Sequence, residues 1–289
     1  MSWLYTIIFA GLIFSSEGNV PNAPTNTANY GDTNTTTIVK LDETEKFEQT
    51  YALNANGRVS VSNVNGSITI ETWDANQVKL EVTKIADTKE RLAEVEVKID
   101  SKPDSFSVET DYNWRREGGN NWRNNGRMEV QYRLTVPKNA VLNEIETVNG
   151  SISITNANNT TKASAVNGTV RATNLRGAAN LSTVNGTVEA VFDQLQTGSK
   201  ISLNTVNGTV NLTIPSDANA TLRADSVNGN ISNDFGLPVR KGQYVGRDLY
   251  GKVGNGDVQI RLNSVNGGLS IKRKQDGKNL NPATNLLPQ

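Results

Sequence analysis

Residues 145–154 read Ile-Glu-Thr-Val-Asn-Gly-Ser-Ile-Ser-Ile and contain the tripeptide that decides the fold. Val-Asn-Gly occurs seven times, and from Asn149 onward its Asn residues are separated by 18, 18, 22, 21 and 38 positions, the last close to two periods. Repeats of about 20 residues are typical of stacked architectures, in which each unit buries its apolar face against its neighbours. The predicted turn residues are Asn65, Gly66, Asn149, Gly150, Asn167, Gly168, Asn185, Gly186, Asn207, Gly208, Asn228, Gly229, Asn266 and Gly267.

The residues on both sides of each tripeptide alternate between apolar and polar. An apolar residue stands four positions before every Asn and another stands three positions after it, as with Leu203 and Val210 around Asn207. This period of two predicts strands with one buried and one solvated face. The parity fits a β-hairpin with φ > 0 at both Asn and Gly. It also fits a corner of a β-solenoid in which Asn side chains stack, and the regular recurrence favours the solenoid.

The composition excludes several classes of protein. With no Cys and no His, the chain has no thiol nucleophile, no Ser-His-Asp triad and no ordinary zinc, haem or iron–sulfur ligand set. Lys and Arg number 29, as do Asp and Glu, so a net charge of zero gives no overall attraction to nucleic acid. The 38 Asn and 24 Gly residues suit turns and short strands. We expect an all-β protein that is not an enzyme and has no cofactor.

The pattern changes along the chain and predicts five segments. An apolar start reads as a signal peptide or N-terminal anchor, which indicates export to the periplasm, cell envelope or extracellular surface. The Asn/Thr-rich spacer and the tail lack apolar periodicity and are predicted to be disordered. A β region that caps the stack lies between the spacer and the repeats, and its residues 106–110 and 128–136 read as a pair of strands. The segments are 1–18 (signal or anchor), 19–45 (spacer), 46–140 (N-terminal β region), 141–272 (Val-Asn-Gly solenoid) and 273–289 (tail).

One polar loop, residues 111–127, carries the predicted binding site. Trp and Arg are the residue types most enriched at binding hot spots, and flat aromatic faces stack on sugars. Four Arg against Asp111 and Glu117 give the loop a local charge of about +2, which favours a glycan or an anionic partner. The predicted binding residues are Trp114, Arg115, Arg116, Trp122, Arg123 and Arg127.

Two short segments resemble calcium loops but fit them poorly. Residues 32–43 have Thr37 where an EF-hand loop needs Gly, so a chance match is the preferred interpretation. Residues 254–258 match a single β-roll unit, for which a turn is preferred. A carboxylate pair for glycoside hydrolysis is the main enzymatic alternative. Glu146, Glu189 and Asp225, however, fall at solvated positions of the alternating pattern.

The segment 56–68, the alternating stretch up to Pro137 and the serial Val-Asn-Gly units together resemble a known bacterial family, the β-strand-repeat proteins of unknown function labelled adhesins. The resemblance covers roughly residues 47–272 and implies a β-solenoid or β-helix-like fold in an exported protein. It supplies no catalytic residues. We therefore expect a non-enzymatic adhesin or envelope-binding protein. A carbohydrate-active enzyme on the same scaffold and an envelope-stress sensor module are the alternatives.

Overall fold

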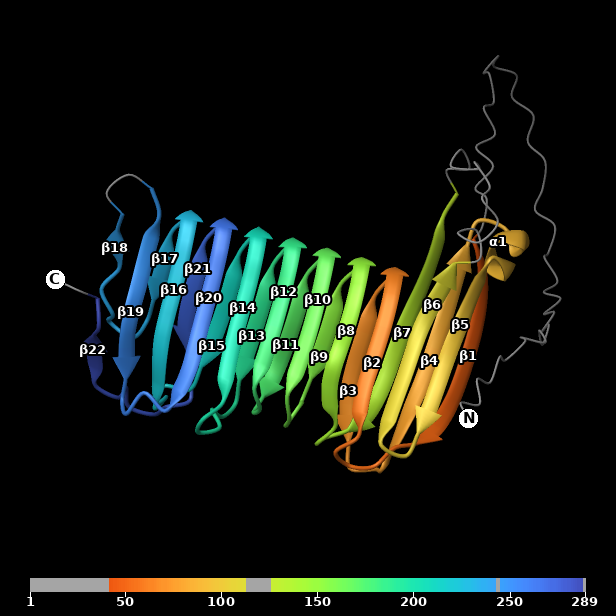
Figure 1. Ribbon diagram of the computed structural model, residues 1–289, viewed down its shortest axis with the longest axis horizontal. Helices are drawn as coiled ribbons and strands as arrows, with labels where there is room; N and C mark the ends of the chain where they lie inside the picture. Colours follow the sequence, from red (N-terminus) through yellow and green to blue (C-terminus); the bar gives the residue numbers. More distant parts are fainter. Residues whose placement is uncertain (1–41, 113–125, 243–244, 288–289) are drawn as a thin grey trace, which may run out of the picture.

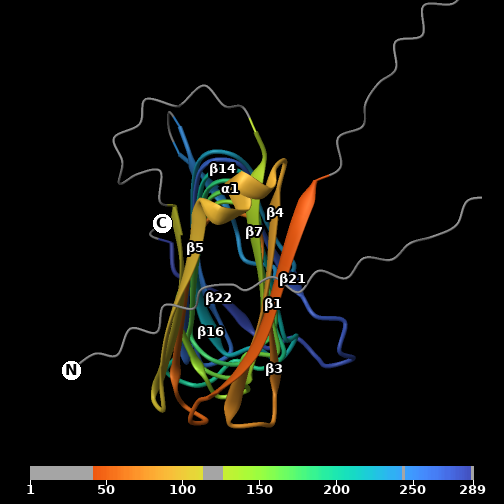
Figure 2. The same ribbon diagram turned by 90° about the vertical axis from the view of Figure 1, so that its right-hand side faces the viewer.

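The computed structural model describes residues 42–112, 126–242 and 245–287. Two β-sheets lie face to face, and their strands run across the long axis of the molecule (Figure 1). Turned by 90°, the molecule shows two flat layers with the corners at their edges (Figure 2). We call them sheet A and sheet B.

Sheet A has twelve strands and sheet B has ten. Those of sheet A are β2 (Arg58–Asn65), β5 (Val95–Lys102), β6 (Ser105–Tyr112), β8 (Val141–Asn149), β10 (Thr161–Asn167), β12 (Ala179–Asn185), β14 (Lys200–Asn207), β16 (Ala220–Asn228), β18 (Arg240–Lys241), β19 (Arg247–Val253), β20 (Val258–Asn266) and β22 (Ala283–Asn285). Those of sheet B are β1 (Glu43–Ala52), β3 (Ile68–Trp73), β4 (Gln77–Ala86), β7 (Met128–Pro137), β9 (Ile152–Thr155), β11 (Val170–Leu175), β13 (Val188–Phe192), β15 (Val210–Ile214), β17 (Ile231–Asn233) and β21 (Leu269–Arg273).

Each Val-Asn-Gly unit crosses from sheet A to sheet B. The strand that ends at Asn belongs to sheet A, and the strand that begins two residues after Gly belongs to sheet B, so the two form one rung of the stack. Equivalent positions of neighbouring rungs pair in parallel, as Asn167 does with Asn149 and with Asn185. The predicted β-solenoid is therefore confirmed, and the hairpin interpretation is wrong because the two arms of a corner lie in different sheets.

The order of rungs departs from the order of the sequence at the C-terminal end. Strands β20 and β21 lie between the rung of β14 and β15 and the rung of β16 and β17. The spacing of 38 residues between Asn228 and Asn266 therefore does not correspond to two consecutive rungs of the stack. The chain passes through β19, which pairs antiparallel with the outer edge of β16, before it returns to form the inserted rung.

The N-terminal region extends both sheets, as the expected cap would. Strand β2 pairs directly with β8, while β6 and β5 continue sheet A and β7, β4 and β1 continue sheet B. Strands β6 and β7 were expected to form a pair, but they lie in different sheets. A short helix, α1 (Lys89–Ala93), follows β4. Strand β1 starts at Glu43, so the first described strand already includes residues before the predicted boundary at residue 46.

The core lies between the two sheets and consists of the inward positions of every rung. The side chains predicted to face inward are buried, as in the rung formed by Leu203, Val210 and Leu212, each 0% exposed. Large buried side chains fill the interior at the N-terminal end, as Phe106 and Tyr132 do, and in the middle of the stack, as Phe192 does. Burying such apolar area is the main stabilising contribution in a chain without disulfides.

The predicted disordered tail, residues 273–289, is instead attached to the last rungs over the part that the structure describes. Strand β22 pairs antiparallel with β19. The Asn281 amide donates to the carbonyl oxygens of Asp217 and Ala218 at 2.8 and 3.1 Å. Sequence reasoning missed this because the tail contributes hydrogen bonds rather than a periodic apolar face. Among the described residues, no helix has the length and apolar character needed to cross a bilayer.

Candidate functional site: the corners and the groove beside them

A ladder of Asn side chains runs along the corners. In six of the seven corner Asn residues, Nδ2 donates to the Oδ1 of the Asn in the adjacent rung, at 2.8 or 2.9 Å. An amide both donates and accepts, so every interior member can bond in both directions, which a carboxylate could not do. In order of stacking, the ladder joins Asn65, Asn149, Asn167, Asn185, Asn207, Asn266 and Asn228.

The glycines form a second column, where the backbones of adjacent rungs approach closely. A Cβ atom on Gly168 would lie 1.8 Å from the carbonyl oxygen of Gly150, and one on Gly208 would lie 1.8 Å from that of Gly186. We predicted φ > 0 for both residues of the turn. That is wrong for Asn, because the only non-glycine residues with positive φ in the described chain are Asn156 and Asn174. Glycine is required mainly because nothing larger fits.

A row of hydroxyl groups one step inside the corners satisfies the glycine carbonyls. Thr183 Oγ1 donates to the Gly168 oxygen at 2.9 Å, and the equivalent residues of most rungs do the same. Ala165 breaks the row, since it occupies the equivalent position and has no hydroxyl for the carbonyl of Gly150. The other hydroxyl donors are Thr147, Thr205, Ser226 and Ser264.

Replacing Ala165 with Thr is expected to stabilise the protein by about 0.5–1.5 kcal/mol, the net contribution of one hydrogen bond. The new hydroxyl would reach the Gly150 carbonyl as Thr147 and Thr183 reach theirs, and Thr is favoured over Ala in strands. Urea denaturation measures the change. Replacing Ala165 with Val is the control, because Val has the same shape without the hydroxyl. Equal midpoints for the two variants would contradict the hydrogen-bond explanation.

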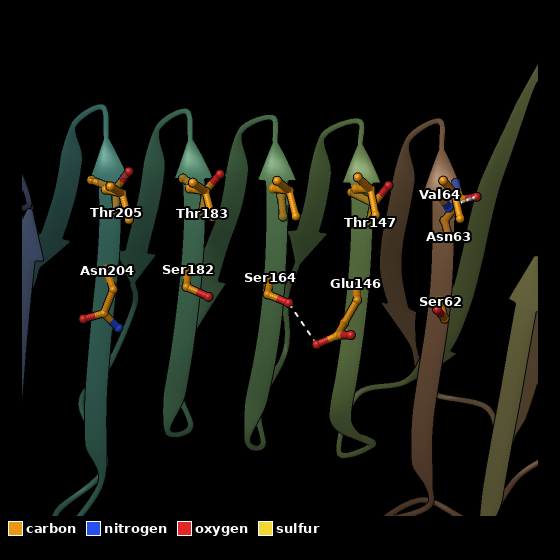
Figure 3. Close-up of a pocket in the computed structure, with 15 residues that line it drawn as sticks. Ser62, Asn63, Val64, Glu146, Thr147, Ser164, Ser182, Thr183, Asn204 and Thr205 are labelled. Carbon is orange, nitrogen blue, oxygen red and sulfur yellow. Dashed lines mark hydrogen bonds between the residues drawn. The ribbon is translucent and has the colours of Figure 1, made fainter. Parts of the chain in front are cut away.

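A groove runs along the outer face of sheet A, directly beside the corners. One wall is a row of valines, which precede Asn in every repeat and are 38–48% exposed in six of the seven rungs. The six are Val148, Val166, Val184, Val206, Val227 and Val265. Side chains of adjacent strands line up in parallel rows across the groove (Figure 3). We call this surface the valine groove and define it by residues 62–64, 146–148, 164–166, 182–184 and 204–206.

The other side of the valine groove carries small polar groups and a single carboxylate. Ser62, Ser164, Ser182 and Asn204 lie in one row with Glu146, which stands between Ser62 and Ser164, and Ser164 Oγ donates to Glu146 at 2.9 Å (Figure 3). Glycoside hydrolysis uses two carboxylates across the scissile bond, and Glu146 has no second acid beside it in this groove. The groove offers hydroxyl, amide and methyl groups, with little charge.

The predicted binding loop falls mostly outside the described residues. Trp114, Arg115, Arg116, Trp122 and Arg123 all lie in the gap at 113–125. Arg127 is described, and its guanidinium contacts Asp42 at 2.7 Å and Glu129 at 2.9 Å. Hydrogen bonds from Gln131 and Arg127 lower the pKa of Glu129, so this pair stays ionised at neutral pH. Two carboxylates therefore balance the charge of Arg127.

The remaining acidic candidates lie in ordinary surface contacts. Glu189 pairs with Arg171 at 2.9 Å and Asp225 with Arg223 at 3.1 Å, both on solvated faces. Within residues 42–112, 126–242 and 245–287, no group of three potential metal ligands comes together. In the segment 254–258 the chain turns between β19 and β20, with Gly254 and Gly256 at positive φ, as its sequence predicted, and Val258 begins β20.

The valine groove was not predicted, although a signal for it was present. The residues two and four positions before Asn face inward, so the residues one and three positions before Asn face solvent. The alternation therefore places the valine next to each Asn on the outer face, and the register of the strands brings these valines into one row.

Comparison with known proteins gave a family match and several distant structural likenesses. Residues 17–272 match the family model described as Toastrack DUF4097. No curated protein matched the chain. A "putative cell adhesion protein" from Clostridium sporogenes is 15% identical, with 80% of this chain and 100% of that chain covered and a TM-score of 0.42. A "putative adhesin" from Bacteroides fragilis is 10% identical, with 80% and 97% covered and a TM-score of 0.33. At these scores the overall geometries differ, and the likenesses carry no conclusion about this chain.

Proposed function

The chain belongs to the Toastrack DUF4097 family, and we propose that it is an exported, non-enzymatic binding protein of the cell envelope. Its valine groove holds an extended, uncharged glycan strand. The observation that carries the proposal is the row of exposed valines at equivalent positions of consecutive rungs. Single exposed apolar residues are normal on a protein surface, but a contiguous row of them marks a contact surface.

The composition of the groove favours an uncharged polymer. Its polar side bears hydroxyl and amide groups that donate and accept hydrogen bonds, and Glu146 is its single charged residue. Neighbouring strands are about 4.8 Å apart, which is close to the length of one sugar unit. A glycan strand lying along the stack would therefore meet an equivalent set of groups at each rung, with its apolar ring faces against the valines.

The apolar start of the sequence, within residues 1–18, supports export. The loop 111–127 remains the predicted contact for an anionic partner.

Replacing Val148, Val166 and Val206 together with Thr is expected to weaken binding to neutral polysaccharides about tenfold or more. Each change removes one buried methyl group, at about 0.8 kcal/mol, and adds a hydroxyl that must be desolvated. The measurement is binding of the purified chain to immobilised neutral and acidic polysaccharides and to isolated envelope fractions. Fractionation of cells that express the full chain, in the same experiment, is expected to place it in the envelope or the medium.

The matched control makes the reverse change on the outer face of sheet B. Replacing Thr155, Thr173 and Thr213 with Val alters the same three rungs and should leave binding unchanged. Unaltered binding by the valine variant, or an equal loss in both variants, would exclude the groove as the binding surface. An intact chain found only in the cytoplasm would exclude export.

A further inference from the structure

One of the seven Asn-Gly corners lacks a backbone hydrogen bond that the other six have. In six corners the Gly N–H donates to the Asn carbonyl oxygen of the next rung, at 2.8–3.1 Å. The bonds run from Gly66 to Asn149, Gly150 to Asn167, Gly168 to Asn185, Gly186 to Asn207, Gly208 to Asn266, and Gly267 to Asn228. The seventh glycine, Gly229, lies in the outermost rung, and its N–H has no acceptor among the described residues.

This difference affects a reaction that is intrinsic to Asn-Gly sequences. The Gly amide nitrogen, after losing its proton, attacks Cγ of the preceding Asn. The Cγ–Nδ2 bond breaks, ammonia leaves and a succinimide forms. Water then opens the ring to aspartate or isoaspartate. A glycine whose N–H is held by a carbonyl oxygen must first break that bond before its nitrogen can react.

We infer that Asn228 is a site of spontaneous deamidation and that the ladder protects the other six corner asparagines. Asn228 is exposed to water, and its Oδ1 accepts no hydrogen bond from the described residues, whereas each interior Asn has both side-chain groups bonded. At the opposite end of the ladder, Asn65 is different, because Gly66 still donates to Asn149.

The product would change the end of the stack. Asn228 Nδ2 donates to Asn266 Oδ1 at 2.9 Å. Deamidation would replace this amide by a carboxylate, which cannot donate and which would place a negative charge beside the Asn266 oxygen. The terminal ladder bond would be lost while the interior bonds stayed in place. Deamidation thus marks the outermost rung and gives a neutral chain one negative charge.

The test is peptide mapping by mass spectrometry of the purified chain during incubation at pH 8. Asn228 is expected to gain the one-dalton shift about ten times faster than Asn185, the matched interior Val-Asn-Gly site, because one hydrogen bond must open first at Asn185. The variant Asn228→Gln, which keeps the amide but forms the cyclic imide slowly, is expected to lose the early product.

A denatured sample separates the effect of the fold from that of the sequence. In urea all seven sites share the same tripeptide, so their rates should become similar. Equal rates at Asn228 and Asn185 in the folded chain would overturn the inference. A tenfold difference that persists in urea would also overturn it, because the ladder would then not be the cause.

Discussion

Replacing Gly208 with Ala is expected to lower the free energy of unfolding by about 3–5 kcal/mol, the combined cost of overpacking and of an unfavourable backbone conformation. The new Cβ would lie 1.8 Å from the carbonyl oxygen of Gly186, and the φ angle of Gly208 is +150°. Because the clashing atom belongs to the backbone of the adjacent rung, relief requires the two rungs to separate. Circular dichroism during urea denaturation measures the loss.

Gly198 provides the control for this prediction. Its φ angle is +78°, but a Cβ there would meet nothing within 4 Å. Replacing it with Ala should therefore cost about 1–2 kcal/mol, the price of the left-handed conformation alone. If the two variants lost the same stability, close packing of the glycine column would not be the reason for glycine at the corners.

Replacing Asn63 with Leu is expected to destabilise the protein by about 3 kcal/mol, because it leaves buried polar groups without partners. Asn63 occupies the place of the corner hydroxyl in the first rung and is 3% exposed. Its Nδ2 donates to the carbonyl oxygens of Val130 and Gly66 at 2.7 and 3.1 Å. Its Oδ1 accepts from Thr110 Oγ1 at 3.0 Å. These bonds connect β2 with β6 and β7, which belong to different sheets.

The companion variant is Tyr132→Phe, which removes only the hydroxyl that lies 2.6 Å from Thr110 Oγ1. It should cost about 1 kcal/mol, because Thr110 keeps its bond to Asn63. Burial raises the pKa of Tyr132, so the phenol stays neutral and this difference should not vary between pH 6 and about 9. A loss in the Asn63 variant no larger than in the Tyr132 variant would show that the amide is not the centre of the network.

The local pattern predicted the strands and their faces well. Alternation around Val-Asn-Gly identified inward residues such as Leu181 and Val188, both 0% exposed, and indicated that Asn side chains would stack. These features depend only on neighbours in the chain, because the side-chain period of a strand is two and fixes each residue to one face.

The candidate site was predicted less well. The sequence drew attention to the Trp- and Arg-rich loop 111–127, whose described member Arg127 is balanced by Asp42 and Glu129. The valine groove depends on the same residue recurring in neighbouring strands. In a single repeat one exposed valine is unremarkable, and it becomes a surface only when the strands lie in register.

The sequence by itself determined that this chain forms strands, that each repeat turns a corner at Asn-Gly and which side chains enter the core. Only the tertiary structure decided which rungs are neighbours: β2 pairs with β8, and β20 lies between β14 and β16. The strands of all the repeats have nearly the same sequence pattern and therefore similar backbone edges. Local sequence cannot show which rung pairs with which. The need for glycine has the same origin, because the carbonyl oxygen that excludes a Cβ belongs to another rung, not to the turn itself.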